Sequence, residues 1–160
     1  MVTKRTEEYL ETIYELVQRK GYARVKDISN QLDVGLSTVT EMLKKLSESD
    51  YINYEKYGAV TLTKKGERIA VELEQKHKVL KDFLVILGID EKVADEDACN
   101  IEHVVNPETI ERLTKFVEFI QKLEKPLWLE KFKTYYEEGV LPECPRIKEN
   151  RGKNINQKQS

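Results

Sequence analysis

Three amphipathic helical segments, followed by a short β-rich pair, fill the first 65 residues, and this order restricts the possible folds more than any other feature. Apolar residues recur at helical spacing from Thr6 to Lys20, with Thr6 as the expected N-cap and Gly21 marking the end. Two shorter helices are predicted over Val25–Leu32 and from about Leu36 to Ser49. A chain with this start buries one stripe of each helix in a shared core.

A two-stranded hairpin is predicted directly after the third helix. The runs 51–55 and 60–63 are rich in β-formers, and 56–59 make the turn, where Gly58 can take a positive φ. A hairpin this small is not stable alone, so it must lie against the helices. Asp33-Val34-Gly35 has the length and glycine content of the turn in a helix-turn-helix. The pattern therefore predicts a winged helix-turn-helix.

The rest of the chain is predicted to be helical up to a polar tail. Helices are expected from Thr63 to about Leu87, from Glu91 to about Val104, from Asn106-Pro107 to about Leu123, and over 128–136. The run 146–160 is expected to be irregular. The fold class is mainly α, with a winged helix in 1–64, an all-helical domain in 65–123, and a short helix with a flexible tail in 124–160.

Composition indicates a soluble chain whose partners are selected by local charge. The formal net charge is -2 and the pI about 5.9, so nucleic-acid binding would depend on where lysines gather on one surface. No apolar run approaches the roughly 20 residues of a membrane span. Neither a signal peptide nor a disulfide framework is evident, because only Cys99 and Cys144 are present. We expect a cytoplasmic protein with reduced thiols and no membrane partner.

The start of the third helix carries small hydroxyl side chains that suit approach to DNA. Backbone amides at a helix N-terminus attract phosphate, and lysines follow one to two turns later and at the hairpin tip. The same residues could simply cap and solvate a surface helix, and some winged helices bind protein instead. The candidate DNA-contacting residues are Lys26, Gly35, Ser37, Thr38, Thr40, Lys44, Lys45 and Lys56.

Candidate metal ligands occur on three of the predicted helices. Cys99, Glu102 and His103 have the i, i+3, i+4 spacing that places a thiolate, a carboxylate and an imidazole on one helical face, a donor set suited to a first-row transition metal. The first helix repeats the i, i+3 spacing with two glutamates, and the long helix has a histidine on its inward stripe. Taken singly, these side chains also fit a solvated face, a core histidine or a small buried cysteine.

The combination resembles the diphtheria toxin repressor family, which includes iron-dependent repressors and manganese transport regulators. The segments that carry the resemblance are 6–14, 36–46, 76–77 and 98–104, and the similarity covers about residues 4–123. It implies a winged-helix domain, a helical metal-binding and dimerisation domain, and a homodimer that grips double-stranded operator DNA when loaded with metal. The ligand roles that it implies fall on Glu8, Glu11, His77, Cys99, Glu102 and His103.

Several positions depart from the family's patterns. Glu8 stands where iron-type members have Met and manganese-type members have Asp, whereas Cys99 matches the iron-type thiolate. Two ancillary iron-type ligands, a Glu and a His, are replaced by Lys81 and Asp95. A cation beside His77 would repel a metal, so the iron-type ancillary site cannot exist unchanged. The chain is also too short for the C-terminal SH3-like domain of longer members.

These features predict a metal-activated transcriptional repressor that controls metal-ion homeostasis and is not an enzyme. The Cys99 thiolate favours Fe(II), with Mn(II) next, and Co, Ni or Zn could substitute in vitro. The alternatives are a Mn(II)-responsive regulator of the same family, or a winged-helix regulator or metalloprotein not controlled by metal. No small-molecule substrate is expected. The predicted dimer surface uses the end of the long helix and 106–123, with apolar area from Phe116, Phe119 and Ile120.

Overall fold

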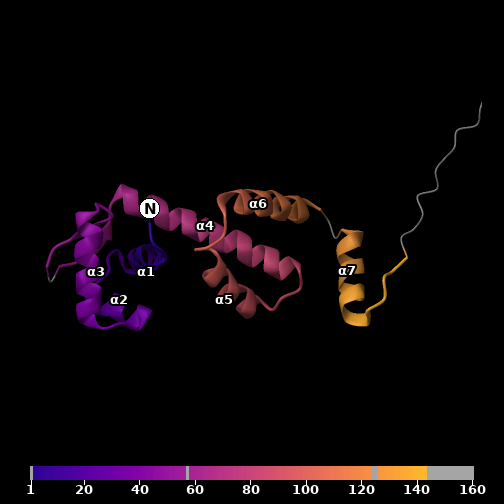
Figure 1. Ribbon diagram of the computed structural model, residues 1–160, viewed down its shortest axis with the longest axis horizontal. Coiled ribbons are helices and arrows are strands. Elements are labelled where there is room, and N and C mark those ends of the chain that lie inside the picture. Colours follow the sequence, from indigo (N-terminus) through magenta and orange to yellow (C-terminus); the bar gives the residue numbers. More distant parts are fainter. Residues whose placement is uncertain (1, 57, 124–125, 144–160) are drawn as a thin grey trace, which may run out of the picture. The chain divides into compact units, whose positions relative to one another are not determined.

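The computed structural model describes residues 2–56, 58–123 and 126–143, and these form a mainly α-helical fold, as predicted (Figure 1). Contacts divide the chain into two compact units, one ending at Lys122 and the other beginning at Leu123. The first unit contains α1 (Lys4–Lys20), α2 (Val25–Leu32), α3 (Leu36–Glu48), β1 (Ile52–Tyr54), β2 (Val60–Leu62), α4 (Lys64–Ile86), α5 (Glu91–Ile101) and α6 (Pro107–Lys122).

The winged-helix part is built around the apolar face of α1. The strands β1 and β2 pair antiparallel with Ile52 opposite Leu62, and Ala23 and Val60 exchange backbone hydrogen bonds of 2.9 and 2.8 Å. These bonds fix the hairpin to the segment after α1, which satisfies the requirement that so small a sheet be supported. The buried core residues are Tyr9, Leu10, Ile13, Leu16, Ala23, Ile28, Val39, Leu43, Leu46, Ile52 and Val60.

Local details of three elements differ from the sequence-based expectation. The N-cap of α1 is Thr3, whose hydroxyl accepts the backbone N–H of Thr6 at 3.2 Å, so Thr6 lies inside the first turn. Gly58 does not adopt a positive φ, and its lack of a side chain instead avoids crowding, because a Cβ there would lie 3.1 Å from the Glu55 oxygen. α5 ends at Ile101 and not near Val104, so Glu102 and His103 follow the helix.

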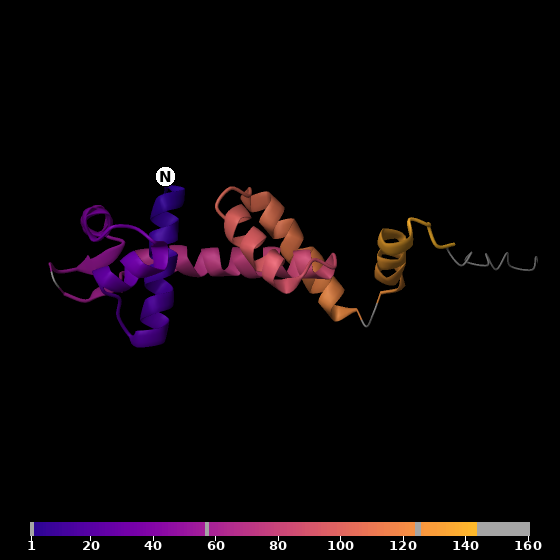
Figure 2. The same cartoon turned by 90° about the horizontal axis from the view of Figure 1, so that it is seen from below.

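The long helix α4 connects the winged helix to the remaining helices. It packs against α1 and β2 near its beginning and against α5 and α6 further along, as Figures 1 and 2 show. Leu73 and Leu80 are buried on the predicted inward stripe, and the rings of Phe83 and Phe116 meet edge to face with centroids 5.9 Å apart. α4 is therefore the element that positions α5 relative to α1.

The apolar residues of α6 divide between the core of the first unit and its surface. Ile120 is only 6% exposed and Phe116 is half-buried, so both pack within the same chain, whereas Phe119 is 56% exposed. Of the three residues predicted to supply a dimer surface, Phe119 is thus the one that the single chain leaves open. The sequence pattern could not separate these roles, because all three lie on one apolar stripe.

The second unit contains α7 (Leu127–Glu138), which begins after Pro126 and ends at Gly139 with a φ of 69°. It is longer than the 128–136 segment that was expected. The predicted polar tail 146–160 and Cys144 lie outside the described residues. Among the helices that the structure describes, none combines the length and the apolar character needed to cross a bilayer.

The start of α4 offers a test of this packing. A Cβ at Gly66 would overlap the backbone oxygen of Tyr51, whereas one at Gly35 would meet nothing closer than 3.9 Å. We expect Gly66→Ala to lower the free energy of unfolding by about 2 to 4 kcal/mol, because backbone cannot yield as a side chain can. Urea denaturation measures this change. The control Gly35→Ala should shift stability by less than about 1 kcal/mol, and equal effects would contradict the packing described.

Candidate metal centre and DNA-contacting surface

A buried glutamate lies at the centre of the candidate site. Glu102 directly follows the last turn of α5, and its backbone N–H still donates to the Ala98 carbonyl at 3.0 Å. The residue is 1% exposed, and its Oε1 atom accepts no hydrogen bond from the described residues. Buried carboxylate oxygens without a donor are costly, so this atom points to a missing positive partner.

Three of the predicted ligands converge around this carboxylate. Glu11 from α1, Glu102 and His103 each offer one ligand atom, and these atoms lie within 4.8 Å of one another. We call these residues the three-residue cluster. Two carboxylates and an imidazole suit a divalent first-row metal, and Oε1 of Glu102, which accepts no hydrogen bond and has His103 Nε2 at 3.4 Å, remains available as a ligand atom. The donors present therefore fit such an ion.

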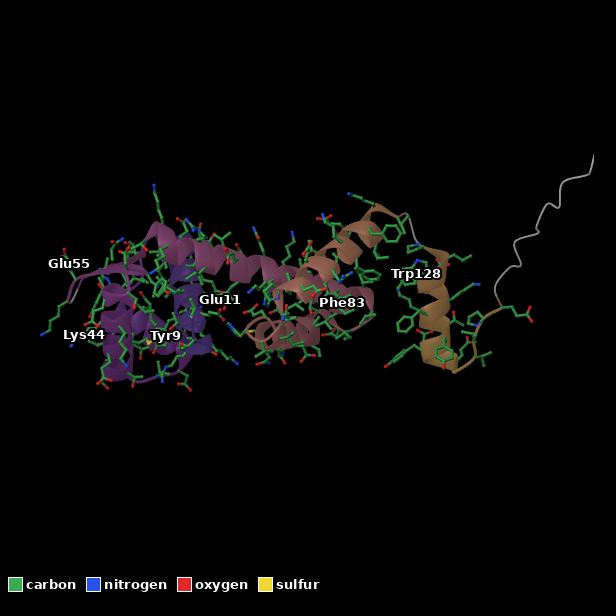
Figure 3. The ribbon with its side chains drawn as sticks, turned by 45° about the horizontal axis from the view of Figure 1, so that its top comes forward. Tyr9, Glu11, Lys44, Glu55, Phe83 and Trp128 are labelled. Atoms are coloured by element: carbon green, nitrogen blue, oxygen red, sulfur yellow. The ribbon has the colours of Figure 1, made fainter. Side chains whose placement is uncertain are left out.

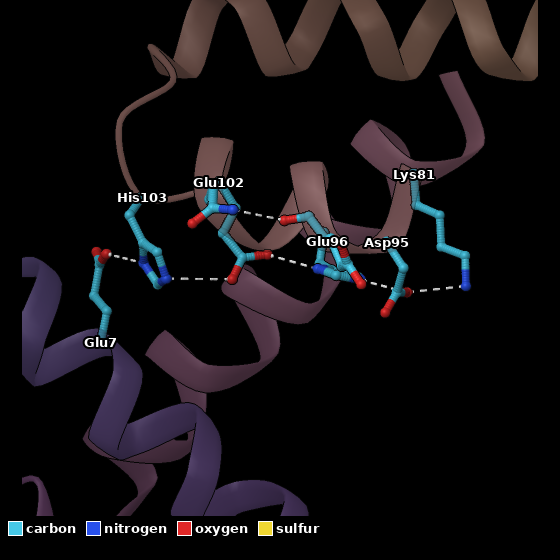
Figure 4. Close-up of polar contacts among 8 residues, drawn as sticks. Glu7, Lys81, Asp95, Glu96, Glu102 and His103 are labelled. Carbon is cyan, nitrogen blue, oxygen red and sulfur yellow. Dashed lines mark hydrogen bonds and ion pairs between the residues drawn. The ribbon is translucent and has the colours of Figure 1, made fainter. Parts of the chain in front are cut away.

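A continuous series of polar contacts runs through two members of the cluster, His103 and Glu102, as Figure 4 shows. Glu7 Oε2 lies 2.9 Å from His103 Nδ1, and His103 Nε2 lies 3.4 Å from Glu102 Oε1. On the other side, Glu102 Oε2 is 3.0 Å from Nδ1 of His77, a half-buried residue of α4. Both predicted histidine ligands therefore contact the same buried carboxylate.

The series continues from His77 to a salt bridge. His77 Nε2 lies 3.2 Å from Asp95 Oδ1, and Lys81 Nζ donates to the same oxygen at 2.9 Å. Lys81 also pairs with Glu91 at 3.4 Å. The two residues that depart from the iron-type pattern are thus in contact with each other. Lys81 therefore adds no unpaired positive charge beside the cluster, because its ammonium is paired with the carboxylates of Asp95 and Glu91.

The electrostatics of the cluster reflect a shortage of positive charge. Burial, followed by the neighbouring Glu11 carboxylate, raises the pKa of Glu102 to about 7. The pKa of Glu11 is raised as well, first by burial and then by Glu15. Two carboxylates held together out of water favour a proton or a metal ion over the doubly charged state.

Glu8 and Cys99 border the same site without joining the cluster. Both line a pocket of about 710 Å³, together with Glu11, His77 and His103. Glu8 is paired with Lys4 at 3.8 Å, and Cys99 is an exposed residue. Partial desolvation of its thiol, followed by the charges of Glu102 and Glu11, raises the pKa of Cys99. The thiol of Cys99 therefore favours its protonated form.

Sequence reasoning did not identify Glu7 or Asp95 as partners of the histidines. Glu7 precedes a predicted ligand by one residue, but nothing in its spacing marks it as a partner of His103, 96 positions away. Asp95 was recognised only as a replacement of a family ligand. Both contacts arise because α1, α4 and α5 pack together, which no local pattern encodes.

The predicted DNA-contacting residues lie in the winged-helix part of the first unit. Lys44 and Glu55 lie toward the α3 and hairpin end, away from Glu11 (Figure 3). Gly35 is the N-cap of α3, and because it has no side chain it leaves the first backbone amides of this helix without a side-chain cap. The Thr40 hydroxyl donates to the Leu36 carbonyl at 2.9 Å, which leaves it less available than the exposed Ser37. Lys26, Lys44, Lys45 and Lys56 are exposed, and Thr38 is half-buried.

The three helices and the hairpin of the winged helix-turn-helix, followed by helices that hold a candidate metal centre, place the protein in the class of winged-helix DNA-binding regulators. Comparison with known families matches residues 1–60 to the iron dependent repressor N-terminal DNA binding domain. Residues 63–125 match the iron dependent repressor metal binding and dimerisation domain. The chain belongs to the diphtheria toxin repressor family of metal-dependent transcriptional repressors, whose members are regulators and not enzymes.

Individual relatives agree with this assignment. The chain is 43% identical over 122 residues to the HTH-type transcriptional regulator MntR of Shouchella clausii, covering 76% of this chain and 85% of the relative. Among solved structures, the manganese regulator SloR is 36% identical with a TM-score of 0.61, covering 71% of this chain and 53% of that one. T. acidophilum IdeR is 34% identical with a TM-score of 0.64, covering 74% and 55%.

The raised pKa of Glu102 predicts how stability depends on pH without metal. Its value of about 7 exceeds the ordinary 4.5, so the folded chain binds this proton more tightly than the unfolded chain. The resulting stability is fully present below about pH 4.5 and is lost as pH rises through about 7. Glu102→Gln removes this loss. In chelator-treated protein, the thermal midpoint of Glu102→Gln should therefore gain on wild type between about pH 5 and pH 8.

The matched control is Glu96→Gln, which changes an exposed glutamate of α5 in the same way. Its midpoint should follow the wild-type curve at every pH. A difference between Glu102→Gln and wild type that stays constant across the series would contradict the buried, charge-crowded carboxylate.

Proposed function

We propose that this repressor binds a divalent transition metal at the three-residue cluster together with His77, and that Glu8 and Cys99 complete the ligand set. The observation that carries the proposal is the buried Glu102 carboxylate, which contacts two histidines, lies near Glu11 and keeps one oxygen without a hydrogen bond. When bound, a divalent cation supplies the positive charge that offsets the repulsion between Glu11 and Glu102.

The placement of the ligands explains how metal binding would reach the DNA-binding surface. Glu11 belongs to α1, which forms the core of the winged helix, whereas Glu102 and His103 follow α5. Side chains that share one site across these elements hold the winged helix at one position relative to α4 and α5. Without that link, the clustered carboxylates favour separation of α1 from α5. The bound state therefore selects one arrangement of α3.

DNA contact is proposed for α3 and the hairpin. Ser37 and Thr38 at the start of α3 are small enough to approach base edges and phosphates, while Lys26, Lys44, Lys45 and Lys56 are placed for phosphate contacts. In a homodimer, two α3 helices would enter successive major grooves about 34 Å apart. The exposed Phe119 of α6 is proposed to contribute to the dimer contact.

The metal is proposed to be Mn(II) or Fe(II). The sequence-based preference for Fe(II) rested on the Cys99 thiolate, whereas the cluster itself offers two carboxylates and one imidazole. Oxygen-rich sites suit Mn(II), and one related structure is that of a manganese regulator. Since the Cys99 thiol holds its proton and is exposed, we propose Mn(II) ahead of Fe(II) as the activating metal, and this order refers to activation and not to raw affinity, in which Fe(II) exceeds Mn(II) at most sites.

A crossed pair of variants tests whether metal activates DNA binding. A duplex selected from a random pool in the presence of Mn(II) serves as probe, and fluorescence anisotropy measures its affinity with and without metal. For wild type we expect at least about a tenfold tighter binding with Mn(II), the size of an ordinary allosteric coupling. Glu102→Gln should lose this response, because a neutral amide neither repels Glu11 nor binds the cation comparably.

Lys44→Ala should behave in the opposite way. It should weaken DNA binding and reduce the slope of log affinity against log salt by about one, while Mn(II) affinity stays unchanged. Lys92→Ala, an exposed lysine of α5, should alter neither quantity. DNA binding by wild type that is equally tight with and without metal would overturn the proposed function.

The role of Cys99 is tested by metal selectivity. Cys99→Ser removes the soft sulfur donor but keeps the volume and the position at the pocket wall. Under anaerobic conditions we expect the Fe(II) affinity to fall by about tenfold and the Mn(II) affinity by only a few-fold, because sulfur matters more to the softer ion. Competition with a chelating dye gives both values. Equal losses for the two metals would contradict a ligand role for the thiol.

A further inference from the structure

On the side of its ring that faces away from Glu102, His77 contacts a residue that the proposed ligand set does not include, Asp95. The ring of this histidine lies between two carboxylates, with Nδ1 3.0 Å from Glu102 Oε2 and Nε2 3.2 Å from Asp95 Oδ1. A neutral imidazole has one N–H donor and one nitrogen with a free lone pair. Which nitrogen keeps its proton therefore decides which nitrogen is available to a metal.

Lys81 determines what Asp95 can do in this contact. Its ammonium donates to the same Oδ1 atom at 2.9 Å, and it also reaches Glu91. A carboxylate held by an ammonium acts as an acceptor, so the bond to Asp95 requires a proton on Nε2. Glu102, the carboxylate at Nδ1, belongs to the proposed ligand set, so on that side of the ring the lone pair is the one that a cation would use. His77 and Lys81 are separated by four residues on α4, and Asp95 reaches both from α5. The arrangement is therefore built from two helices that pack against each other.

We propose that Asp95, fixed by Lys81, is a positioning residue that accepts the Nε2 proton of His77 and thereby presents the Nδ1 lone pair to the metal site. The proposal rests on the proposed function, because it takes His77 as a ligand. Histidines that ligate metals usually donate their other N–H to a carboxylate or carbonyl, which fixes the tautomer and the orientation of the ring. Asp95 and Lys81 supply this support here.

The rest of the site agrees with this direction. Nδ1 of His77 lies on the Glu102 side, whereas Nε2 lies on the side of a half-exposed aspartate already paired with an ammonium. A cation on that side would meet the charge of Lys81. His103 shows the same arrangement in mirror form, since its Nδ1 contacts Glu7 and its Nε2 lies toward Glu102. Each histidine thus has one carboxylate inside the site and one outside it.

The first test reads the tautomer in the metal-free protein and needs no ligand. The chain has only two histidines, so a His77→Gln spectrum identifies the His77 signals in long-range ¹H–¹⁵N correlations. Spectra are recorded at increasing pH until the His77 signals no longer change, because only a neutral ring has distinct tautomers. We expect the Nε2–H tautomer of His77 in wild type and in Asp97→Ala, a matched change of an exposed α5 aspartate. Asp95→Ala should shift the population toward Nδ1–H. A wild-type ring protonated on Nδ1 would overturn the proposal.

The second test measures Mn(II) affinity of the full chain by calorimetry. Loss of a residue that supports a ligand typically costs 10- to 100-fold in metal affinity. We expect a loss of about tenfold or more for Asp95→Ala and a smaller one for Asp95→Asn, whose side-chain oxygen still accepts the Nε2 proton. Asp97→Ala should bind as wild type does. Equal losses in Asp95→Ala and Asp95→Asn would show that the negative charge of Asp95 matters, as a neutraliser of Lys81 or as a ligand, and would overturn the positioning role. No loss in either variant would overturn it as well.

The two tests separate failure of this inference from failure of the proposed function. If wild type binds neither Mn(II) nor Fe(II), the metal-dependent function fails, while the tautomer of the metal-free protein still decides how Asp95 orients His77. If wild type binds Mn(II) and Glu102→Gln does not, but Asp95→Ala leaves both the affinity and the tautomer unchanged, the function stands and the positioning role is wrong.

Discussion

The buried carboxylate of Glu102 is the constraint on which the arrangement of this molecule depends. It is 1% exposed and lies beside the Glu11 side chain of α1. It contacts His77 of α4 and His103, its neighbour in sequence. A buried charge costs several kcal/mol unless it is compensated. α1 belongs at once to the winged-helix core and, through Glu11, to this cluster, so a change of charge at Glu102 acts on an element of the winged-helix core.

Most of the fold was predictable because its signals are local. The stripe of α1, the glycine after it and the hairpin between Ile52 and Leu62 each follow from periodicity and turn chemistry within a few residues. The differences arise where the outcome depends on distant parts. α5 stops at Ile101 although the helical pattern continues to about Val104, and the side chain of Glu102 contacts His77 of α4. The division of α6 between core and surface likewise depends on where α4 lies.

The site was only partly predictable for a related reason. The spacing of Cys99, Glu102 and His103 led to the expectation of one shared helical face, and Glu102, although it follows α5, keeps a helical backbone and an N–H bond to Ala98. The spacing could not tell that Glu102 is buried while Cys99 is exposed. Family resemblance predicted the donors, whereas the carboxylates Glu7 and Asp95 contact the two histidines across helices. Such partners are specified by tertiary packing and leave no mark in sequence spacing.

Lys81 and Asp95 are best understood as one change. Lysine alone at position 81 would place a positive charge four residues after His77, on the same side of α4, and would oppose a metal. Aspartate alone at position 95 would add a carboxylate to a region already rich in them. Paired at 2.9 Å, they largely cancel in charge, and the aspartate still accepts from His77. The pair therefore leaves the charge that attracts a cation to Glu11 and Glu102, while it orients the ring that faces them.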